Sequence, residues 1–219
     1  MPRCFIAITP PAEIRDSVGE WQSRLQQRLA APHSLHWPRP QQCHLTLRFL
    51  GEVPGSRLEP LAHSLRELCT ERAPFDLHLA TPGVFPDWRH PRVLWLGVDG
   101  GLERLRGLQS VVKTRCAPFG DIRKVERFHP HLTLARIREP GSPTCRELKQ
   151  VLYSVDPIRP IRWTVHSVEL IASTMLPAGS RYESLLQARL RFNGRAQPAA
   201  PPVPDSSLAS IDPRFPPPV

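Results

Sequence analysis

The feature that most constrains this chain is a tetrapeptide, His-Leu-Thr-Leu, that occurs at residues 44–47 and again at residues 131–134. One copy of this string is expected by chance in fewer than about one in a hundred chains of this composition. A lone His-x-Thr would be weak evidence of a site, whereas two identical tetrapeptides indicate an internal duplication. Any fold for this chain must therefore explain two equivalent copies.

Similar elements surround both copies, with similar spacing. Alternating or β-prone runs predict strands at residues 3–9, 44–50, 75–81, 92–98, 131–137, 161–172 and 182–191. Helical periodicity predicts helices with apolar residues over 14–29, 58–68 and 102–116, and a fourth helix at about 143–155. The Pro- and Gly-rich segment 82–91 predicts a loop, after which the order of elements begins again.

The repeat predicts an α+β fold. We expect two antiparallel β-sheets facing a central cleft, with helices on the outside and a pseudo-twofold axis that brings the two tetrapeptides face to face. Residues 1–193 should form this bilobal domain. Residues 194–219 are rich in Pro, Ala and Ser and predict a disordered tail, with a Pro-rich docking ligand as the alternative.

Composition limits the compartment and the partner. The chain carries 29 Lys and Arg against 20 Asp and Glu, which favours a phosphate-bearing partner, although a general compositional bias explains such an excess equally well. Its five cysteines are odd in number and form no Cys-x-x-Cys pair, so neither a disulfide framework nor a zinc knuckle is predicted. With no apolar run of membrane-spanning length, we expect a cytoplasmic monomer without a membrane partner.

The tetrapeptide itself suggests acid–base chemistry. In a strand, His44 and Thr46 point to one face and the two leucines to the other, and the same holds for His131 and Thr133. Two imidazoles can respectively take a proton from a nucleophile and give one to a leaving oxygen, as phosphodiester cleavage requires. Threonine hydroxyls can donate to the phosphate oxygens as charge builds up. Neither a metal nor a cofactor is then needed.

These residues resemble the two-histidine (2H) phosphoesterase superfamily, and within it the bacterial and archaeal RNA 2′,3′-cyclic phosphodiesterases, first described as 2′-5′ RNA ligases. The resemblance rests on residues 3–8 (RCFIAI), 44–53 (HLTLRFLGEV), 91–98 (PRVLWLGV) and 128–136 (FHPHLTLAR). It implies hydrolysis of RNA ending in a 2′,3′-cyclic phosphate to a 2′-phosphomonoester, with reverse 2′-5′ ligation possible.

The same resemblance implies roles for individual residues. His44 would be the proton donor to the 3′ oxygen and His131 the proton acceptor that activates water, an order that residue chemistry alone leaves open. Arg136 would bind the phosphate and Phe49 a base or ribose, with core packing as the alternative for Phe49. Strict alternation turns Phe49 and Arg136 away from the histidine face unless each strand is bulged.

Two other functions remain open: a non-catalytic RNA-binding module, and a metal hydrolase that uses His44 and His131 as ligands. The absence of carboxylates at ligand spacing argues against the second. The remaining seven histidines have no repeated context and are interpreted as surface or structural, and Trp95 and Trp163 as core residues. The chain has no glycine-rich phosphate-binding loop, which argues against the use of ATP.

Overall fold

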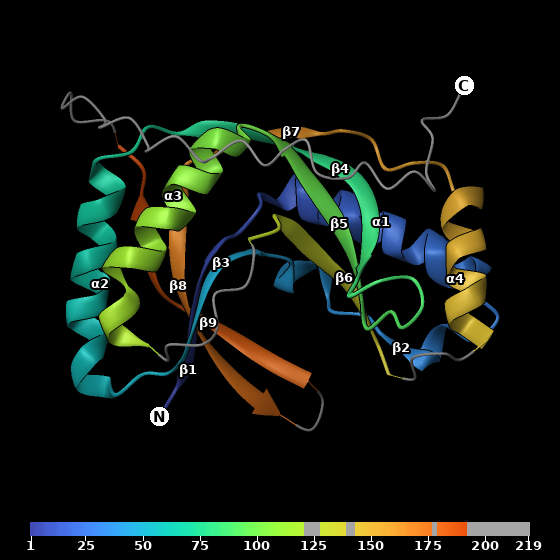
Figure 1. Cartoon of the computed structure of the whole chain (residues 1–219), viewed down its shortest axis with the longest axis horizontal. Helices are drawn as coiled ribbons and strands as arrows, with labels where there is room; N and C mark the ends of the chain where they lie inside the picture. The colour runs from blue at the N-terminus through green and yellow to red at the C-terminus, as the bar shows by residue number, and fades with distance from the viewer. Residues whose placement is uncertain (121–127, 139–142, 177–178, 192–219) are drawn as a thin grey trace.

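Two antiparallel sheets divide the two copies of the tetrapeptide between them (Figure 1). The structure, a computed structural model, describes residues 1–120, 128–138, 143–176 and 179–191. The first sheet, in the order β3-β1-β8-β9, consists of β1 (Arg3–Ile8), β3 (Leu45–Glu52), β8 (Ser167–Leu176) and β9 (Gly179–Arg189). The second, in the order β2-β6-β5-β4-β7, consists of β2 (Leu35–His36), β4 (Phe75–Phe85), β5 (Val93–Gly100), β6 (His131–Ile137) and β7 (Arg162–Val165).

Helices cover the outer sides of these sheets. The α-helices of the described residues are α1 (Ala12–Arg28), α2 (Gly55–Thr70), α3 (Leu102–Arg115) and α4 (Pro143–Ser154). Short 3-10 turns span η1 (Pro32–Ser34), η2 (Pro40–Gln42) and η3 (Ala117–Phe119). In Figure 1, α2 and α3 lie beside the first sheet, and α1 and α4 lie beside the second. The α+β architecture predicted from the duplication is confirmed.

Each half of the chain contributes to both sheets. Strand β1 belongs to the first sheet, but the helix that follows it, α1, packs against the second, where Gln22 contacts Leu134 of β6. Strand β5 belongs to the second sheet, but α3 packs against the first, where Gln109 contacts Leu47 of β3. Likewise β4 pairs with β5, and β8 pairs with β1. Because each half supplies a helix and a strand to the sheet of the other half, the two motif strands are held by residues from both halves of the chain.

Two predicted segments need correction. The single strand predicted at residues 161–172 is two strands, β7 and β8, which break at His166 and belong to different sheets. The buried positions change phase there, from Trp163 and Val165 to Val168 and Leu170, because the chain changes sheets. The loop predicted at residues 82–91 is wrong in its first part, since β4 continues to Phe85 through a register shift before Pro82.

The motif leucines anchor both strands in the core. Leu45, Leu47, Leu132 and Leu134 are at most 3% exposed. A fully buried leucine side chain contributes about 1.5–3 kcal/mol to stability, so these four residues fix the register of β3 and β6. The predicted division of each strand into a core face and a polar face is confirmed.

No helix within the described ranges is both long enough and apolar enough to cross a membrane. The predicted tail at residues 194–219 lies outside the described residues and stays a prediction. Cys4, Cys43, Cys69 and Cys116 are buried free thiols.

Candidate active site

His44 lies where the chain enters β3. Its Nδ1 atom is 2.7 Å from the backbone carbonyl oxygen of Gln42. A carbonyl oxygen can only accept a hydrogen bond, so Nδ1 carries the proton. Nε2 is therefore the nitrogen of His44 that can take up or release a proton. The backbone two residues upstream thus fixes both the ring orientation and the reactive nitrogen.

His131, the first residue of β6, repeats this arrangement. Its Nδ1 atom is 2.7 Å from the carbonyl oxygen of His129, again two residues upstream. The same reasoning leaves Nε2 of His131 as the reactive nitrogen. The two histidines therefore share a tautomer as well as a sequence motif.

The motif threonines lie on the same side of their sheets as the histidines. Thr46 pairs with Ala7 of β1, and Thr133 pairs with Trp95 of β5. Both threonines are half-buried, whereas the leucines between them and their histidines are fully buried. Each imidazole therefore has a hydroxyl beside it on the same face, as predicted.

A β-bulge in β6 returns Arg136 to this face. The strand pairs with β5 on both sides of Leu134, which itself has no partner. An extra residue of this kind reverses the alternation, so that Arg136, five residues after His131, faces the same way as His131 and Thr133. Arg136 is exposed. Arg136 could face the same side as His131 only if β6 contained a bulge, and the structure contains that bulge.

Strand β3 contains a bulge at the equivalent position. Leu47 has no partner on β1, although its two neighbours are paired. Phe49 consequently pairs with Phe5 on the polar face, with the two ring centroids 5.9 Å apart. Phe49 is 66% exposed, which excludes core packing as its role. Both bulges lie three residues after a motif histidine, so the backbone irregularity is duplicated along with the motif.

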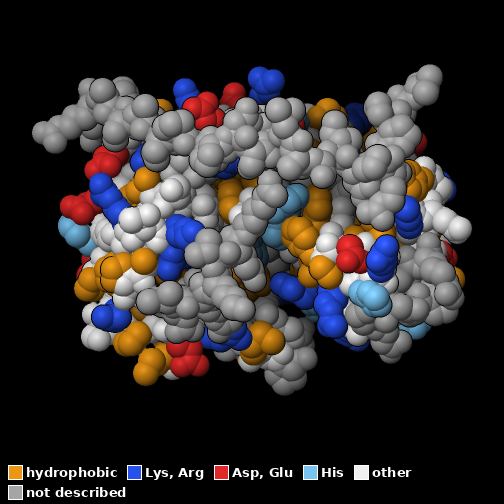
Figure 2. Space-filling model, viewed as in Figure 1, with side chains coloured by type: hydrophobic (Ala, Val, Ile, Leu, Met, Phe, Trp, Pro, Cys, Tyr) orange, Lys and Arg blue, Asp and Glu red, His pale blue; other side chains and the backbone are white. Residues whose placement is uncertain are grey.

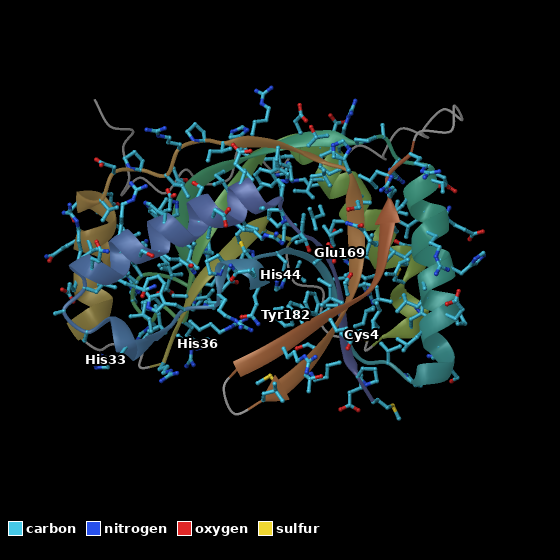
Figure 3. The ribbon with its side chains drawn as sticks, turned by 180° about the vertical axis from the view of Figure 1, so that it is seen from behind. Cys4, His33, His36, His44, Glu169 and Tyr182 are labelled. Carbon is cyan, nitrogen blue, oxygen red and sulfur yellow. The ribbon has the colours of Figure 1, made fainter. Side chains whose placement is uncertain are left out.

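The surroundings of His44 are aromatic and acidic. Its ring centroid is 4.7 Å from that of Phe5 and 5.3 Å from that of Tyr182, which meets it edge-on. Figure 3 shows His44, Tyr182 and Glu169 together near the middle of the molecule. His44, Glu169 and Tyr182 line a cavity of about 230 Å³. Tyr182 and Glu169 come from β9 and β8, and no sequence motif pointed to either residue.

A second cavity, of about 190 Å³, adjoins the first because Tyr182 lines both. Its other lining residues include Phe5, Phe49 and Arg136. Figure 2 shows histidine side chains within a hollow between the lobes, with hydrophobic and basic side chains around it. The site therefore offers a cationic position next to an exposed aromatic ring.

His131 has different neighbours. Its ring centroid is 4.9 Å from that of Phe85 and 6.4 Å from those of Trp95 and His129. The rings of His129 and Trp95 are also in contact, with centroids 4.6 Å apart and planes tilted by 55°. The interpretation of Trp95 as a core residue is therefore wrong, whereas His129 is exposed, as expected of a surface histidine. Trp95 lies on the cleft face of the second sheet because it pairs with Thr133, and His129 lies beside the rings of Trp95 and His131.

Burial lowers the pKa of both motif histidines, because it disfavours the charged imidazolium. The positive charge of Arg136 lowers both pKa values further, so Arg136 acts on both rings. The pKa of His44 is also lowered by His131, which couples the two motifs electrostatically. Glu169 has the opposite effect and raises the pKa of His44. Glu169 thus distinguishes two otherwise similar groups.

The thiol next to His44 is not a candidate nucleophile. Cys43 precedes His44, but burial raises the pKa of its thiol to about 12, so it remains protonated and unreactive. Within residues 1–120, 128–138, 143–176 and 179–191, no three His, Cys, Asp or Glu side chains cluster as metal ligands would.

Comparison with known proteins agrees with this geometry. The sequence profile of the 2′-5′ RNA ligase superfamily matches residues 10–174. A Thermus thermophilus protein named RNA 2′,3′-cyclic phosphodiesterase is 32% identical over 216 residues, covering 91% of this chain and 96% of its own. An Aquifex aeolicus protein of the same name is 32% identical over 167 residues, covering 76% of this chain and 87% of its own.

Solved structures share the fold. The crystal structure of Escherichia coli LigT complexed with 3′-AMP superposes with a TM-score of 0.69 at 27% identity, covering 86% of this chain and 98% of LigT. The structure of TT0787 from Thermus thermophilus gives a TM-score of 0.69 at 29% identity, covering 87% of this chain and 99% of that protein. The paired motifs, the two-sheet fold and the extended sequence match together assign this chain to the 2′-5′ RNA ligase superfamily.

Proposed function

We propose that this chain is an RNA 2′,3′-cyclic phosphodiesterase that opens the cyclic phosphate to a 2′-phosphomonoester. One observation carries the proposal: two electrostatically coupled imidazoles present the same nitrogen, Nε2, because a backbone carbonyl 2.7 Å away occupies each Nδ1. Relatives named RNA 2′,3′-cyclic phosphodiesterase from bacteria and archaea support the choice of reaction.

In the proposed reaction, Nε2 of His131 accepts a proton from a water molecule. The water oxygen attacks phosphorus, and the bond from phosphorus to the 3′ oxygen breaks on the opposite side. The protonated Nε2 of His44 gives its proton to the departing 3′ oxygen. The product carries a 2′-phosphate and a 3′-hydroxyl, and the two histidines have exchanged protonation states. Transfer through solvent restores them for the next cycle.

The side chains around the two imidazoles would stabilise the developing negative charge. The hydroxyls of Thr46 and Thr133 can each donate to a non-bridging phosphate oxygen. Arg136 supplies a fixed positive charge close to both imidazoles. Once an anionic phosphate is bound, it offsets the effect of Arg136 on the pKa of each histidine and favours the protonated acid that the reaction needs.

The position of Glu169 supports His44 as the acid. Glu169 lines the same cavity as His44 and raises its pKa, which favours the protonated form. Burial, the largest effect, lowers the pKa of both histidines, and so do Arg136 and a neighbouring imidazole, whereas a backbone hydrogen bond raises both. Glu169, the smallest of the effects on His44, has no counterpart at His131, whose pKa is not raised by any carboxylate of the described residues. A group kept neutral is suited to accept a proton. The role order suggested by family resemblance therefore gains a physical argument.

An RNA end is the proposed substrate. Phe49 is exposed beside Arg136 in the 190 Å³ cavity, where its ring can stack on a base or ribose while the guanidinium binds phosphate. Because the chemistry is reversible, a 5′-hydroxyl that replaces water would be joined through a 2′-5′ bond. Residues 1–193 would contain all of this machinery.

The test is an oligonucleotide that ends in a 2′,3′-cyclic phosphate, incubated with the protein in the presence of a chelator. We expect a 2′-phosphomonoester at an undiminished rate, identified by the position of the phosphate in the product. Loss of turnover on chelation would favour a metal hydrolase. Tight binding without turnover would favour a non-catalytic RNA-binding module.

A further inference from the structure

A buried glutamine lies behind the motif strand of His131. Gln22 of α1 is 4% exposed and is the one polar side chain that is fully buried in the described part of the chain. Its Nε2 atom donates to the carbonyl oxygen of Leu134 at 2.9 Å and to that of Pro38 at 3.2 Å. Burying an amide is costly unless it is hydrogen-bonded, so the residue type at position 22 needs an explanation.

A second glutamine occupies the matching place behind the motif strand of His44. Gln109 of α3 is half-buried, and its Nε2 atom donates to the carbonyl oxygen of Leu47 at 3.3 Å. Leu47 and Leu134 are the extra residues of the two bulges, three residues after each motif histidine. Both glutamines therefore bind the same backbone atom of the two duplicated bulges.

These bulges determine which residue faces the substrate. If β6 lost its bulge, Arg136 would turn from the cleft face to the core face, because a shift of one residue moves side chains to the opposite side of a sheet. The same change in β3 would turn Phe49 away. An amide that binds the carbonyl of the extra residue stabilises the bulged backbone, since unbulging would break that hydrogen bond and, for the buried Gln22, leave only the longer one to Pro38.

We propose that Gln22 and Gln109 are positioning residues: Gln22 holds the β6 bulge and thereby Arg136, and Gln109 holds the β3 bulge and thereby Phe49. The proposal rests on the proposed function only for the roles of Arg136 and Phe49. Each glutamine belongs by sequence to the opposite half, since α1 follows β1 and α3 follows β5. The exchange of helices thus makes each half of the chain set the geometry of the other half's site.

The test uses Gln22→Met and Gln109→Met, which keep side-chain length and remove the donor. Gln22→Met should raise KM for the cyclic-phosphate oligonucleotide and the Kd of inorganic phosphate by roughly three- to tenfold. It should also lower kcat, because Arg136 stabilises the developing charge as well as the bound phosphate. Gln109→Met should leave the Kd of phosphate unchanged and raise KM for the oligonucleotide.

Double-mutant cycles give the specific signature. In a background of Arg136→Met, Gln22→Met should have no further effect on KM, because the side chain that it positions is gone. In a background of Phe49→Leu, it should keep its full effect. Gln109→Met should show the reverse pattern. Additive effects of Gln22→Met and Arg136→Met would overturn the proposal.

Trp21→Phe is the matched control for loss of a hydrogen bond from α1. Trp21 is also buried, and its Nε1 atom donates to the carbonyl oxygen of Asp156 at 3.1 Å, away from the motif strands. It should lower the melting temperature without changing the Kd of phosphate. An equal rise in Kd for Trp21→Phe and Gln22→Met would mean general destabilisation and would also overturn the proposal.

The two hypotheses fail separately. Wild-type protein that binds phosphate but opens no cyclic phosphate would contradict the proposed function, while the phosphate Kd of Gln22→Met would still report on the bulge. If Gln22→Met does not fold, Gln109→Met and its cycle with Phe49→Leu decide the matter, because Gln109 is only half-buried.

Discussion

The two motif regions are alike in backbone and different in side chains. In both, a carbonyl two residues upstream binds Nδ1 of the histidine, and a bulge follows three residues later. The position five residues after the histidine differs, with Phe49 in one region and Arg136 in the other. The duplicated backbone leaves Nε2 free on both imidazoles, whereas the side chains around the two rings have diverged.

The neighbours of the histidines differ in the same way. His44 lies against Phe5 and Tyr182, within the electrostatic reach of Glu169. His131 lies against Phe85 and near a second imidazole, His129. If the proposed mechanism holds, the two histidines differ as acid and base because of the side chains around them, while the duplicated backbone stays the same.

The largest effect is expected when either motif imidazole is removed. His44→Ala and His131→Ala should each lower kcat by roughly 10²- to 10⁴-fold, the usual contribution of one positioned acid or base. The double variant should lose much less than the product of the single losses, because both groups act in one transfer. Rates are measured on a cyclic-phosphate oligonucleotide with a chelator present.

His63→Ala is the control for loss of a histidine elsewhere. His63 lies on α2 with an exposed side chain, 3.3 Å from Glu67. Its replacement should leave kcat unchanged. Near-normal rates for either motif variant would contradict two-histidine catalysis and leave the duplication as a feature of the fold alone.

The next test asks whether the threonines are as equivalent as the backbone. Thr46→Val and Thr133→Val keep the branched shape and remove one donor to the phosphate. Each should cost on the order of 2 to 4 kcal/mol at most in kcat/KM. Similar losses are expected because each threonine has the same spacing from its histidine. A loss confined to one variant would show that the phosphate sits against one sheet only.

The position five residues after each histidine should instead behave asymmetrically. Arg136→Met should lower kcat/KM roughly 10- to 100-fold for every cyclic phosphate, through loss of a charged hydrogen bond. Phe49→Leu should lower it by about tenfold for substrates with a base, through loss of stacking. The comparison is made between an oligonucleotide and a base-free cyclic phosphate. Equal losses of Phe49→Leu on both substrates would contradict base stacking.

The part of the structure that the sequence predicts is the part that periodicity and repetition encode. The elements around both tetrapeptides follow from alternation and from helical stripes such as Ile14, Val18 and Trp21, all buried as expected. The polar face of each motif follows from the alternation of side chains. The sequence also shows that each motif strand must contain a bulge if Phe49 and Arg136 are to face the cleft, because strict alternation turns both side chains away.

What the sequence leaves open depends on which strands pair across the two halves. Glu169 and Tyr182 reach His44 only because β8 pairs with β1 and β9 follows it, an order that alternation does not encode. His129 was overlooked because it lacks a partner motif, although its carbonyl fixes His131. Gln22 looked like an ordinary polar residue on a helix until the exchange of helices placed it beneath β6.

The smallest predicted effect bears on the difference between the two regions, the charge of Glu169. The general acid must be protonated, so its pKa sets the alkaline limb of the pH profile, and the base must be neutral, so its pKa sets the acidic limb. Glu169 raises the pKa of His44, so Glu169→Gln should lower that pKa and move the alkaline limb of kcat/KM to lower pH. The acidic limb should stay, because beyond burial the pKa of His131 responds to His129 and Arg136. Ser184→Ala is the control: it removes the 2.8 Å hydrogen bond to Glu169 but keeps the charge, so neither limb should move. If Glu169→Gln moved the acidic limb instead, His44 would be the base and the proposed roles would be reversed.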